Sequence, residues 1–126
     1  MILKDLTYSE ELVMKSIWDS DRKPVLSEVT KHVNDAYGTD WARQTVSTFL
    51  GRLVKKEYLQ LQGNERRNST YYKILVTEKE YRRKLYKRHI SFWNHNDITE
   101  FINEMIDNGD LTYSDIEVIL KNRKGD

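Results

Sequence analysis

The chain has 126 residues, of which 38% are apolar and 33% charged, a size and polarity that suit one compact domain or two small lobes. It contains no cysteine, which excludes disulfides, thiolate metal sites and a cysteine nucleophile. The first residues, MILKDLTYSEEL, contain no apolar signal segment, and no apolar run reaches membrane-spanning length. We therefore expect a cytoplasmic protein with no membrane partner.

The charge is strongly segregated along the chain, although the net charge is only +1. Residues 1–40 hold 5 basic and 8 acidic groups (−3), residues 41–96 hold 13 and 4 (+9), and residues 97–126 hold 3 and 8 (−5). A basic middle between acidic ends indicates a localised surface for a polyanion. Solvated charge without a partner is the alternative interpretation.

Two helices are predicted before residue 40. Thr7 and Glu10 have the spacing of a capping box, and an apolar face follows, which predicts a helix over about 8–19. The segment DSDRKP ends it. Ser27 is expected to cap a second helix, which ends before Gly38.

The third helix is predicted over 42–56, ARQTVSTFLGRLVKK. At about 100° per residue, Val46, Phe49, Leu50 and Leu53 share one face. The opposite face carries Gln44, Thr48, Gly51 and Lys55, with Ser47 and Arg52 on its flanks, and no acid. A glycine in this place costs about 1 kcal/mol in helix propensity relative to alanine.

Alternating residues 58–62 and 71–75 flank the turn-rich, basic segment GNERRNS, which predicts a hairpin with its tip at 63–69. A fourth helix should begin near Thr77 and is strongly basic along 79–88. Asp97 and Glu100 resemble a cap pair for a fifth helix, and Thr112 and Asp115 resemble one for a sixth. Both of these helices carry apolar residues at helical spacing, namely Ile98, Phe101, Ile102, Met105, Ile106, Ile116, Ile119 and Leu120.

This order of elements predicts an α+β, mostly α fold: a winged helix-turn-helix domain over 1–76, followed by a helical dimerisation region over 77–126. In the winged-helix plan the third helix enters the DNA major groove and the hairpin lies on the backbone. Gln can bond an adenine edge, and Ser and Thr can bond bases or phosphates. Gly51 would let the helix approach the DNA closely. We expect Arg43, Arg52, Lys55, Lys56, Arg66 and Arg67 to contact phosphates or bases.

The sequence resembles the BlaI/MecI/CopY group of bacterial repressors, which includes the penicillinase repressors. The resemblance covers nearly the whole chain and is carried by LTYSEELVMKSIW, WARQTVSTFLGRLVKKEYL, YYKILVTEKEY and DLTYSDIEVILKN. The second segment is similar to the family pattern Trp-x-x-x-Thr-[Val/Ile]-x-Thr-Leu-[Leu/Ile]-x-Arg-Leu-x-Lys-Lys-Gly, and this is the most specific of the four.

The resemblance implies a homodimeric repressor that binds an inverted-repeat operator through its winged helix and pairs through its C-terminal helices. It implies DNA contacts at Thr45, Thr48, Arg52 and Lys55, with Arg66 or Arg67 in the wing. It implies a dimer interface in the tail helices, formed by Phe101, Ile102, Met105, Ile106, Ile116 and Ile119.

Three departures from the family pattern bear on regulation and local structure. The copper-responsive branch needs cysteines, which this chain lacks. The β-lactam-responsive branch is cleaved at an Asn-Phe bond, and here Glu104-Met105 aligns with that place. The inducing signal, whether a small molecule or a protease, is left open. Glu57 stands where the family has glycine, and a left-handed backbone there would strain it by about 1 kcal/mol.

Two rival classes remain. An enzyme or metal site would have to use His32, His89 or His95, the last two with Asp97 and Glu100 nearby, but no His pair at metal-ligand spacing and no phosphate loop supports this. We expect no cofactor. A winged helix used for protein contact is the other rival, and it would not need an acid-free face on the third helix. The aromatic segment ISFWNHN indicates helix packing or a dimer core, and leaves an effector pocket open.

Overall fold

The computed structural model describes residues 2–20, 24–63 and 70–125. Along the chain it has helices α1 (Tyr8–Trp18), α2 (Leu26–Tyr37) and α3 (Arg43–Lys55), strands β1 (Leu59–Gln62) and β2 (Tyr71–Ile74), and helices α4 (Glu78–Trp93), α5 (Ile98–Asp107) and α6 (Tyr113–Lys124). The α+β, mostly helical fold expected from the sequence is confirmed. No helix in the described ranges is both long and apolar enough to cross a membrane.

Two compact units make up the chain, Met1–Arg82 and Arg83–Asp126. The sequence placed the boundary at 76/77, just before α4. In the structure the two compact units meet inside α4, and the first turns of α4 pack on α1. The Trp18 Nε1–H donates to the Val76 carbonyl at 2.9 Å, and the Tyr81 hydroxyl donates to the Glu11 carboxylate. Burial and this hydrogen bond raise the pKa of Tyr81 far above its usual range.

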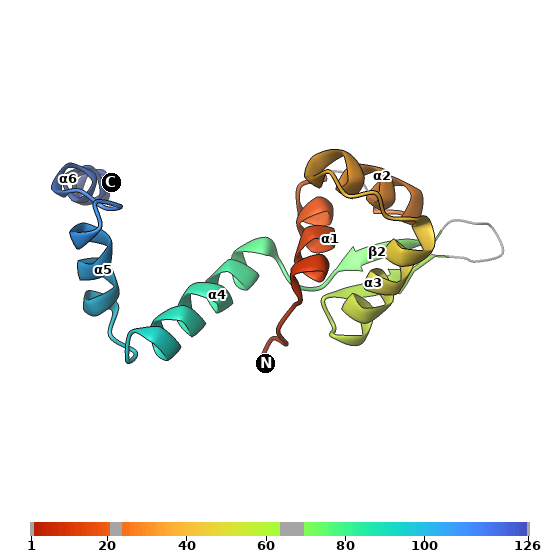
Figure 1. The fold of residues 1–126 in the computed structure, drawn as a ribbon, viewed down its shortest axis with the longest axis horizontal. Helices are drawn as coiled ribbons and strands as arrows, with labels where there is room; N and C mark the ends of the chain where they lie inside the picture. Colours follow the sequence, from red (N-terminus) through yellow and green to blue (C-terminus); the bar gives the residue numbers. More distant parts are fainter. Residues whose placement is uncertain (1, 21–23, 64–69, 126) are drawn as a thin grey trace. The chain divides into compact units, whose positions relative to one another are not determined.

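The core of the first unit lies among α1, α2 and α3 (Figure 1). It consists of apolar side chains from the three helices, closed by residues next to the hairpin: Val13, Met14, Ile17, Val29, Val33, Val46, Leu50, Leu53, Tyr58, Leu59, Val76 and Tyr81. These are the positions that recur every three or four residues along each helix. The helical periodicity of the sequence therefore corresponds to one shared core.

Strands β1 and β2 form a two-stranded antiparallel sheet that runs from Leu59 opposite Ile74 to Gln62 opposite Tyr71. The Tyr72 amide donates to the Pro24 carbonyl at 2.9 Å, which ties β2 to the segment that leads into α2. Burial raises the pKa of Tyr72. The Tyr72–Pro24 bond and the buried side chain of Leu59 at the base of the hairpin hold the wing against the helical core.

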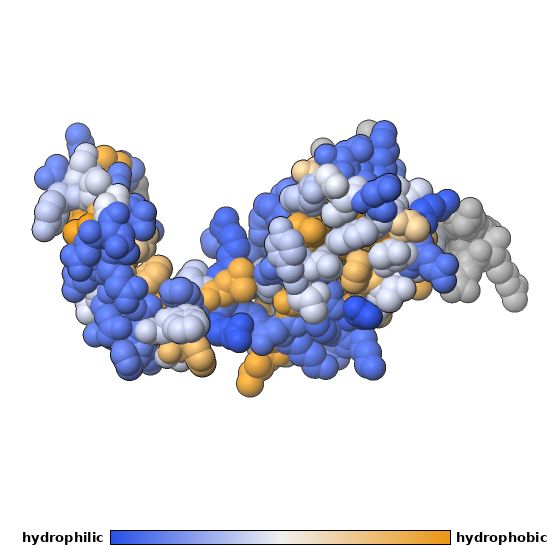
Figure 2. Space-filling model, viewed as in Figure 1, coloured by the Kyte–Doolittle hydropathy of each residue, from blue (hydrophilic) through white to orange (hydrophobic). Residues whose placement is uncertain are grey.

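The second unit has little interior of its own. Ile90 in the last turn of α4 and Asn94 directly after this helix are buried, but neither α5 nor α6 has a buried residue. Exposed apolar side chains include Phe92, Trp93, Ile98, Tyr113, Val118, Ile119 and Leu120. Figure 2 shows apolar patches on the surface of this unit. An apolar stripe without a cover is typical of a region that packs against another chain.

The helix caps agree with the sequence in three places and disagree in two. Capping boxes are present at Thr7–Glu10 and Thr112–Asp115, and the Thr77 hydroxyl accepts the Glu80 N–H at 3.1 Å. The expected Ser27 cap is wrong: α2 begins one residue earlier, with Val25 at the N-cap and no side-chain bond. Asp97 does cap α5 by accepting the Thr99 N–H, but without the reciprocal Glu100 side-chain bond that would complete a capping box.

Candidate nucleic-acid interface

Helix α3 presents the face that the sequence predicted as DNA-binding. Val46, Leu50 and Leu53 are buried on its inner side. On the outer side the predicted contact residues Arg43, Gln44, Thr45, Thr48, Gly51, Arg52 and Lys55 are all exposed, and Ser47 is half-buried. No acidic residue occurs between Arg43 and Lys55. The structure therefore gathers short polar groups and cations on one accessible, acid-free surface.

Three features organise this outer face. The Thr48 hydroxyl donates to the Gln44 carbonyl one turn back, at 3.1 Å. The Arg52 guanidinium lies 5.7 Å from the centre of the Phe49 ring, and Phe49 packs on Trp41 with ring centroids 5.0 Å apart. Stacking on an aromatic ring holds an arginine in one orientation at little entropic cost. Arg52 is therefore the most preorganised cation of this face.

Gly51 is not required by the fold. Its backbone is helical, and a Cβ atom added there would meet nothing within 4 Å. Alanine would fit and would favour the helix by about 1 kcal/mol. The glycine consequently has no structural reason in the isolated chain, which agrees with the prediction that it gives clearance to a partner.

The turn between α2 and α3 is held by a side chain that the sequence analysis missed. Asn34, in the last turn of α2, donates from Nδ2 to the Trp41 carbonyl at 3.0 Å. Its Oδ1 accepts the Trp41 N–H at 3.0 Å and the Thr39 hydroxyl at 2.7 Å. With Gly38 left-handed at the end of α2 (φ 67°), these bonds fix the angle at which α3 begins. Gly38 signalled the end of α2 in the sequence, but nothing there identified Asn34 as the side chain that holds the turn.

The sequence analysis expected Lys56 to contact phosphates or bases, but in the structure Lys56 pairs with Glu10 instead. Its Nζ is 2.6 Å from Glu10 Oε1 and 2.9 Å from the Asp5 carbonyl oxygen. Burial acts to raise the pKa of Glu10, but the hydrogen bonds from Lys56 and Thr7 and the lysine charge outweigh it and hold that pKa below its usual range. Lys56 therefore joins α3 to α1 inside the unit, because a buried carboxylate needs a cation.

At the end of α3, Glu57 adopts the left-handed backbone conformation that the sequence analysis considered a source of strain. Glu57 has φ 65°, its N–H donates to the Val54 carbonyl at 3.0 Å, and the Tyr58 N–H donates to the Leu53 carbonyl at 2.9 Å. These two bonds form a Schellman motif, in which glycine is the preferred left-handed residue. The departure from the family pattern is thus a strained residue and not a different turn.

The wing is described only in part. Its strands and Gly63, with φ 105°, are in place. Arg66 and Arg67, predicted to contact phosphates, lie outside the described residues, and so does most of the predicted tip over 63–69.

The predicted dimerisation residues share the two tail helices. Phe101, Ile102, Met105, Ile106 and Ile116 are half-buried and Ile119 is exposed. The ring of His89 contacts the Phe101 ring, with centroids 5.1 Å apart, and His95 Nδ1 lies 3.1 Å from Glu100 Oε2. Within the described ranges, no three His, Asp or Glu side chains are grouped so that they could hold a metal ion.

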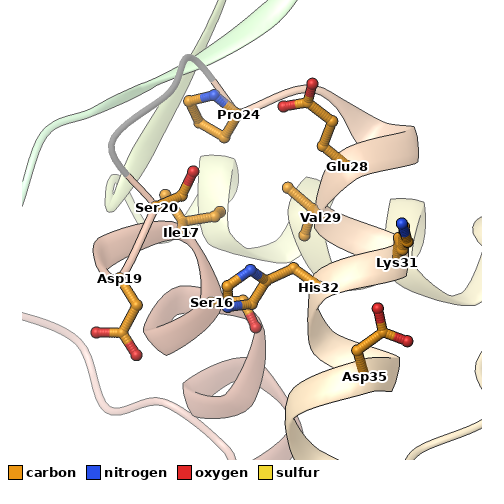
Figure 3. A pocket seen from close by; sticks show the side chains of 10 residues that line it. All are labelled: Ser16, Ile17, Asp19, Ser20, Pro24, Glu28, Val29, Lys31, His32 and Asp35. Atoms are coloured by element: carbon orange, nitrogen blue, oxygen red, sulfur yellow. The ribbon is translucent and has the colours of Figure 1, made fainter.

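A cavity of about 510 Å³ lies between the end of α1 and α2. Figure 3 shows His32 among its lining side chains, with Asp19 and Asp35 around it and Ile17 and Val29 behind. No residue of α3 lines it. The cavity and the outer face of α3 are therefore separate surfaces of the same unit.

Comparison with known families agrees with this arrangement. A family model described as penicillinase repressor matches residues 6–122, from the N-cap region of α1 into the last turn of α6. No curated protein sequence matches the chain. Since the match spans both units, the chain belongs to the penicillinase repressor (BlaI/MecI/CopY) family of transcriptional repressors.

Proposed function

We propose that this protein is a homodimeric repressor that binds an inverted-repeat operator, with α3 in the major groove and the wing on the adjacent backbone. The observation that carries the proposal is the exposed, acid-free face of α3, mounted on a packed three-helix core. A surface helix normally mixes acids with bases, and acids are unfavourable only where the partner is itself anionic. Such a repressor acts in the cytoplasm, where the operator is.

Base reading is assigned to Gln44, Thr45, Ser47 and Thr48, and phosphate or guanine contact to Arg43, Arg52 and Lys55. Gln offers a bidentate bond to adenine, and Arg offers one to guanine. Gly51 stands among them, and its missing side chain lets the helix backbone come close to the DNA. Arg66 and Arg67 complete the assignment in the wing.

Dimerisation is assigned to the tail helices. α5 and α6 have no buried residue, yet their apolar side chains recur at helical spacing. A second copy would cover these side chains, and a two-fold dimer places two α3 helices on two related half-sites. The operator should then be an inverted repeat with half-site centres about 34 Å apart, or a multiple of that distance.

Selection of duplexes from a randomised DNA library by the purified full-length protein tests the DNA assignment. We expect enrichment of an inverted repeat, with affinity that falls by roughly 10³–10⁵ between 50 and 200 mM salt if 6–10 phosphates are contacted. Recovery of unrelated sequences, or binding that ignores salt, would favour the rival class, a winged helix that contacts protein.

Ile102→Asp tests the dimer assignment, because a carboxylate in the proposed apolar interface would be buried without a partner. We expect monomers in analytical ultracentrifugation at concentrations where the unaltered protein is a dimer. Asp107→Asn, an exposed change on the same helix, is the matched control and should leave the dimer intact. Dimers of the Ile102→Asp variant would contradict the interface.

A further inference from the structure

Helix α4 carries an unusual density of positive charge that the proposed function leaves unused. Six of the ten residues from 79 to 88 are basic: Lys79, Arg82, Arg83, Lys84, Lys87 and Arg88. The helix has two acids, Glu78 and Glu80, and Glu78 already binds Lys15 at 2.5 Å. The local excess of cations is therefore not neutralised by the helix itself.

Three of these cations form one stripe. Lys79, Arg83 and Lys87 are spaced four residues apart, so their side chains follow one another along a single face of the helix. All three are exposed, and within the described part of the chain none of the three makes an ion pair. Like charges at this spacing repel one another and disfavour the helix. An anionic partner would offset this repulsion between the three cations.

We propose that this stripe contacts backbone phosphates of the DNA between the two half-sites, as a sequence-independent contact in addition to α3 and the wing. The exposed hydroxyl of Tyr86, on the same face, is a further phosphate donor. The inference rests on the proposed function, since it requires an operator with two half-sites bound by a dimer.

The connectivity of the chain supports this partner. α4 begins in the unit that carries α3 and ends in the unit assigned to dimerisation. In a two-fold dimer with half-sites about 34 Å apart, each half-site lies about 17 Å from the dyad. A 16-residue helix spans about 24 Å at 1.5 Å per residue. α4 has the length to run over the DNA that separates the half-sites.

The stripe also has a suitable length. Lys79 and Lys87 are about 12 Å apart along the helix axis at 1.5 Å per residue. One DNA strand presents a phosphate about every 3.4 Å of helix axis, so three or four phosphates fall within that length. Three cations can therefore each meet a phosphate of a single strand.

The acidic tail of a second copy is the competing partner, and four of its eight acids are already engaged within their own chain. The Glu104 carboxylate accepts the Asn94 amide at 2.7 Å, and Glu100 lies beside His95 at 3.1 Å. Asp97 and Asp115 cap helices, and the hydrogen bonds of Thr99 and Thr112 hold the pKa values of these two carboxyls below their usual range. Four acids of the tail thus already have partners in their own chain.

The test compares two triple variants of the full-length protein. Lys79→Gln, Arg83→Gln and Lys87→Gln together remove the stripe. Lys121→Gln, Arg123→Gln and Lys124→Gln together remove the same number of exposed cations from α6 and serve as the control. Fluorescence anisotropy measures binding to a duplex selected by the unaltered protein, over a series of salt concentrations. Ultracentrifugation and thermal melting confirm that both variants are folded dimers.

With six stripe cations per dimer, we expect the negative slope of log affinity against log salt to become less steep by up to about 5 units in the stripe variant. The sequence preference should stay the same, and the control should keep the slope of the unaltered protein. When the phosphates between the half-sites of the same duplex are replaced by uncharged methylphosphonates, the affinity of the unaltered protein and of the control variant should fall. The affinity of the stripe variant should not change. This second comparison ties the effect to those phosphates and not to net charge.

The possible outcomes separate the two proposals. If the stripe variant keeps the unaltered salt slope, or responds to methylphosphonates as the unaltered protein does, the phosphate contact is overturned while the repressor assignment stands. If the stripe variant becomes monomeric, the stripe serves the acidic tail of a second copy, and the DNA contact is again overturned. If the unaltered protein selects no duplex at all, it is the proposed function that fails.

Discussion

The two units of this chain differ in how much of their structure they can hold alone. Met1–Arg82 contains a core of buried side chains drawn from three helices and the base of a hairpin. Arg83–Asp126 contains two helices without a single buried residue. Side-chain helix caps nevertheless occur in both units, with a capping box at the start of α1 and of α6.

The difference shows that local signals and burial are independent requirements. A cap fixes where a helix begins and stabilises it by about 1 kcal/mol, whereas burial of a large apolar side chain contributes about 1.5–3 kcal/mol. The first unit has both within one chain. The second unit has the caps, and we infer that its burial comes from a second copy.

The largest effect expected from this comparison comes from a matched pair of substitutions. Leu50 is fully buried and Leu120 is 52% exposed. Leu50→Ala should destabilise the first unit by about 2–5 kcal/mol, because it leaves a cavity in a closed core. Leu120→Ala should have an effect that depends on protein concentration, since its burial would come from dimerisation. Urea denaturation at two concentrations a hundredfold apart distinguishes the two. A concentration-independent loss at Leu120 would mean that the second unit has a core of its own.

A smaller loss is expected when the internal ion pair is broken by Lys56→Met. Removing one partner of a buried pair costs about 3–5 kcal/mol, and the partial exposure of Lys56 reduces this to about 2–3. In the unaltered protein the pKa of Glu10 is lowered, so the stability that it contributes is present above its unfolded pKa and lost as the pH falls through its folded pKa.

In the variant, burial without a cation should raise the pKa of Glu10, and the penalty should disappear once that carboxyl is protonated. The stability difference between the two proteins should therefore be greatest near pH 7 and shrink toward pH 4. Chemical denaturation across this range measures it. A stability difference that stays constant with pH would show that Lys56 acts through packing of its side chain. Glu11→Gln, at a half-buried carboxyl of the same helix, is the control.

If the first unit alone carries sequence recognition, substitutions on the outer face of α3 should change the base preference of the protein. Gln44→Ala or Thr48→Ala should cost about 1–3 kcal/mol of DNA affinity and relax the preference at one base pair of each half-site. Neither side chain packs in the core, so thermal stability should hardly change. Gel-shift titration against a set of single-base operator variants measures the preference. An unchanged preference would remove that residue from base readout, and Lys31→Ala on α2 is a control outside the proposed interface.

The smallest effects are expected at Gly51 in α3 and at Glu57 just after this helix. Glu57→Gly should stabilise the protein by about 1 kcal/mol, since it relieves a left-handed residue in the Schellman motif. Gly51→Ala should stabilise it by a similar amount through helix propensity, but should weaken DNA binding if the glycine provides clearance. Thermal melting and anisotropy on the same samples give both quantities. If Gly51→Ala binds DNA as well as the unaltered protein, the glycine has no part in the contact.

Much of the fold could be predicted from the sequence because its signals are local. The helix periods, the capping boxes at Thr7 and Thr112 and the hairpin all follow from residues close together in the chain. Ser27 is an exception, because local propensity favours serine over valine at an N-cap, yet α2 begins with Val25 at that position.

Contacts between distant residues were less accessible. Lys56 was expected to contact phosphates or bases, since a helical wheel cannot show that Glu10, 46 residues away, would be buried beside it. Asn34 was overlooked because its three bonds to Thr39 and Trp41 depend on the path of the turn. The candidate interface itself was predictable, since its exposure follows from the apolar period of α3.

The bond between the Thr48 hydroxyl and the Gln44 carbonyl bears on which bases the protein would distinguish. A hydroxyl has one hydrogen to donate, and in this helix the carbonyl one turn back already accepts it. While that bond persists, Thr48 offers a base only its lone pairs and its methyl group. It would then favour the amino groups of adenine or cytosine, or the thymine methyl, over the acceptor edge of guanine. Half-sites without guanine opposite Thr48 are the expected signature of this side chain in the selected operators.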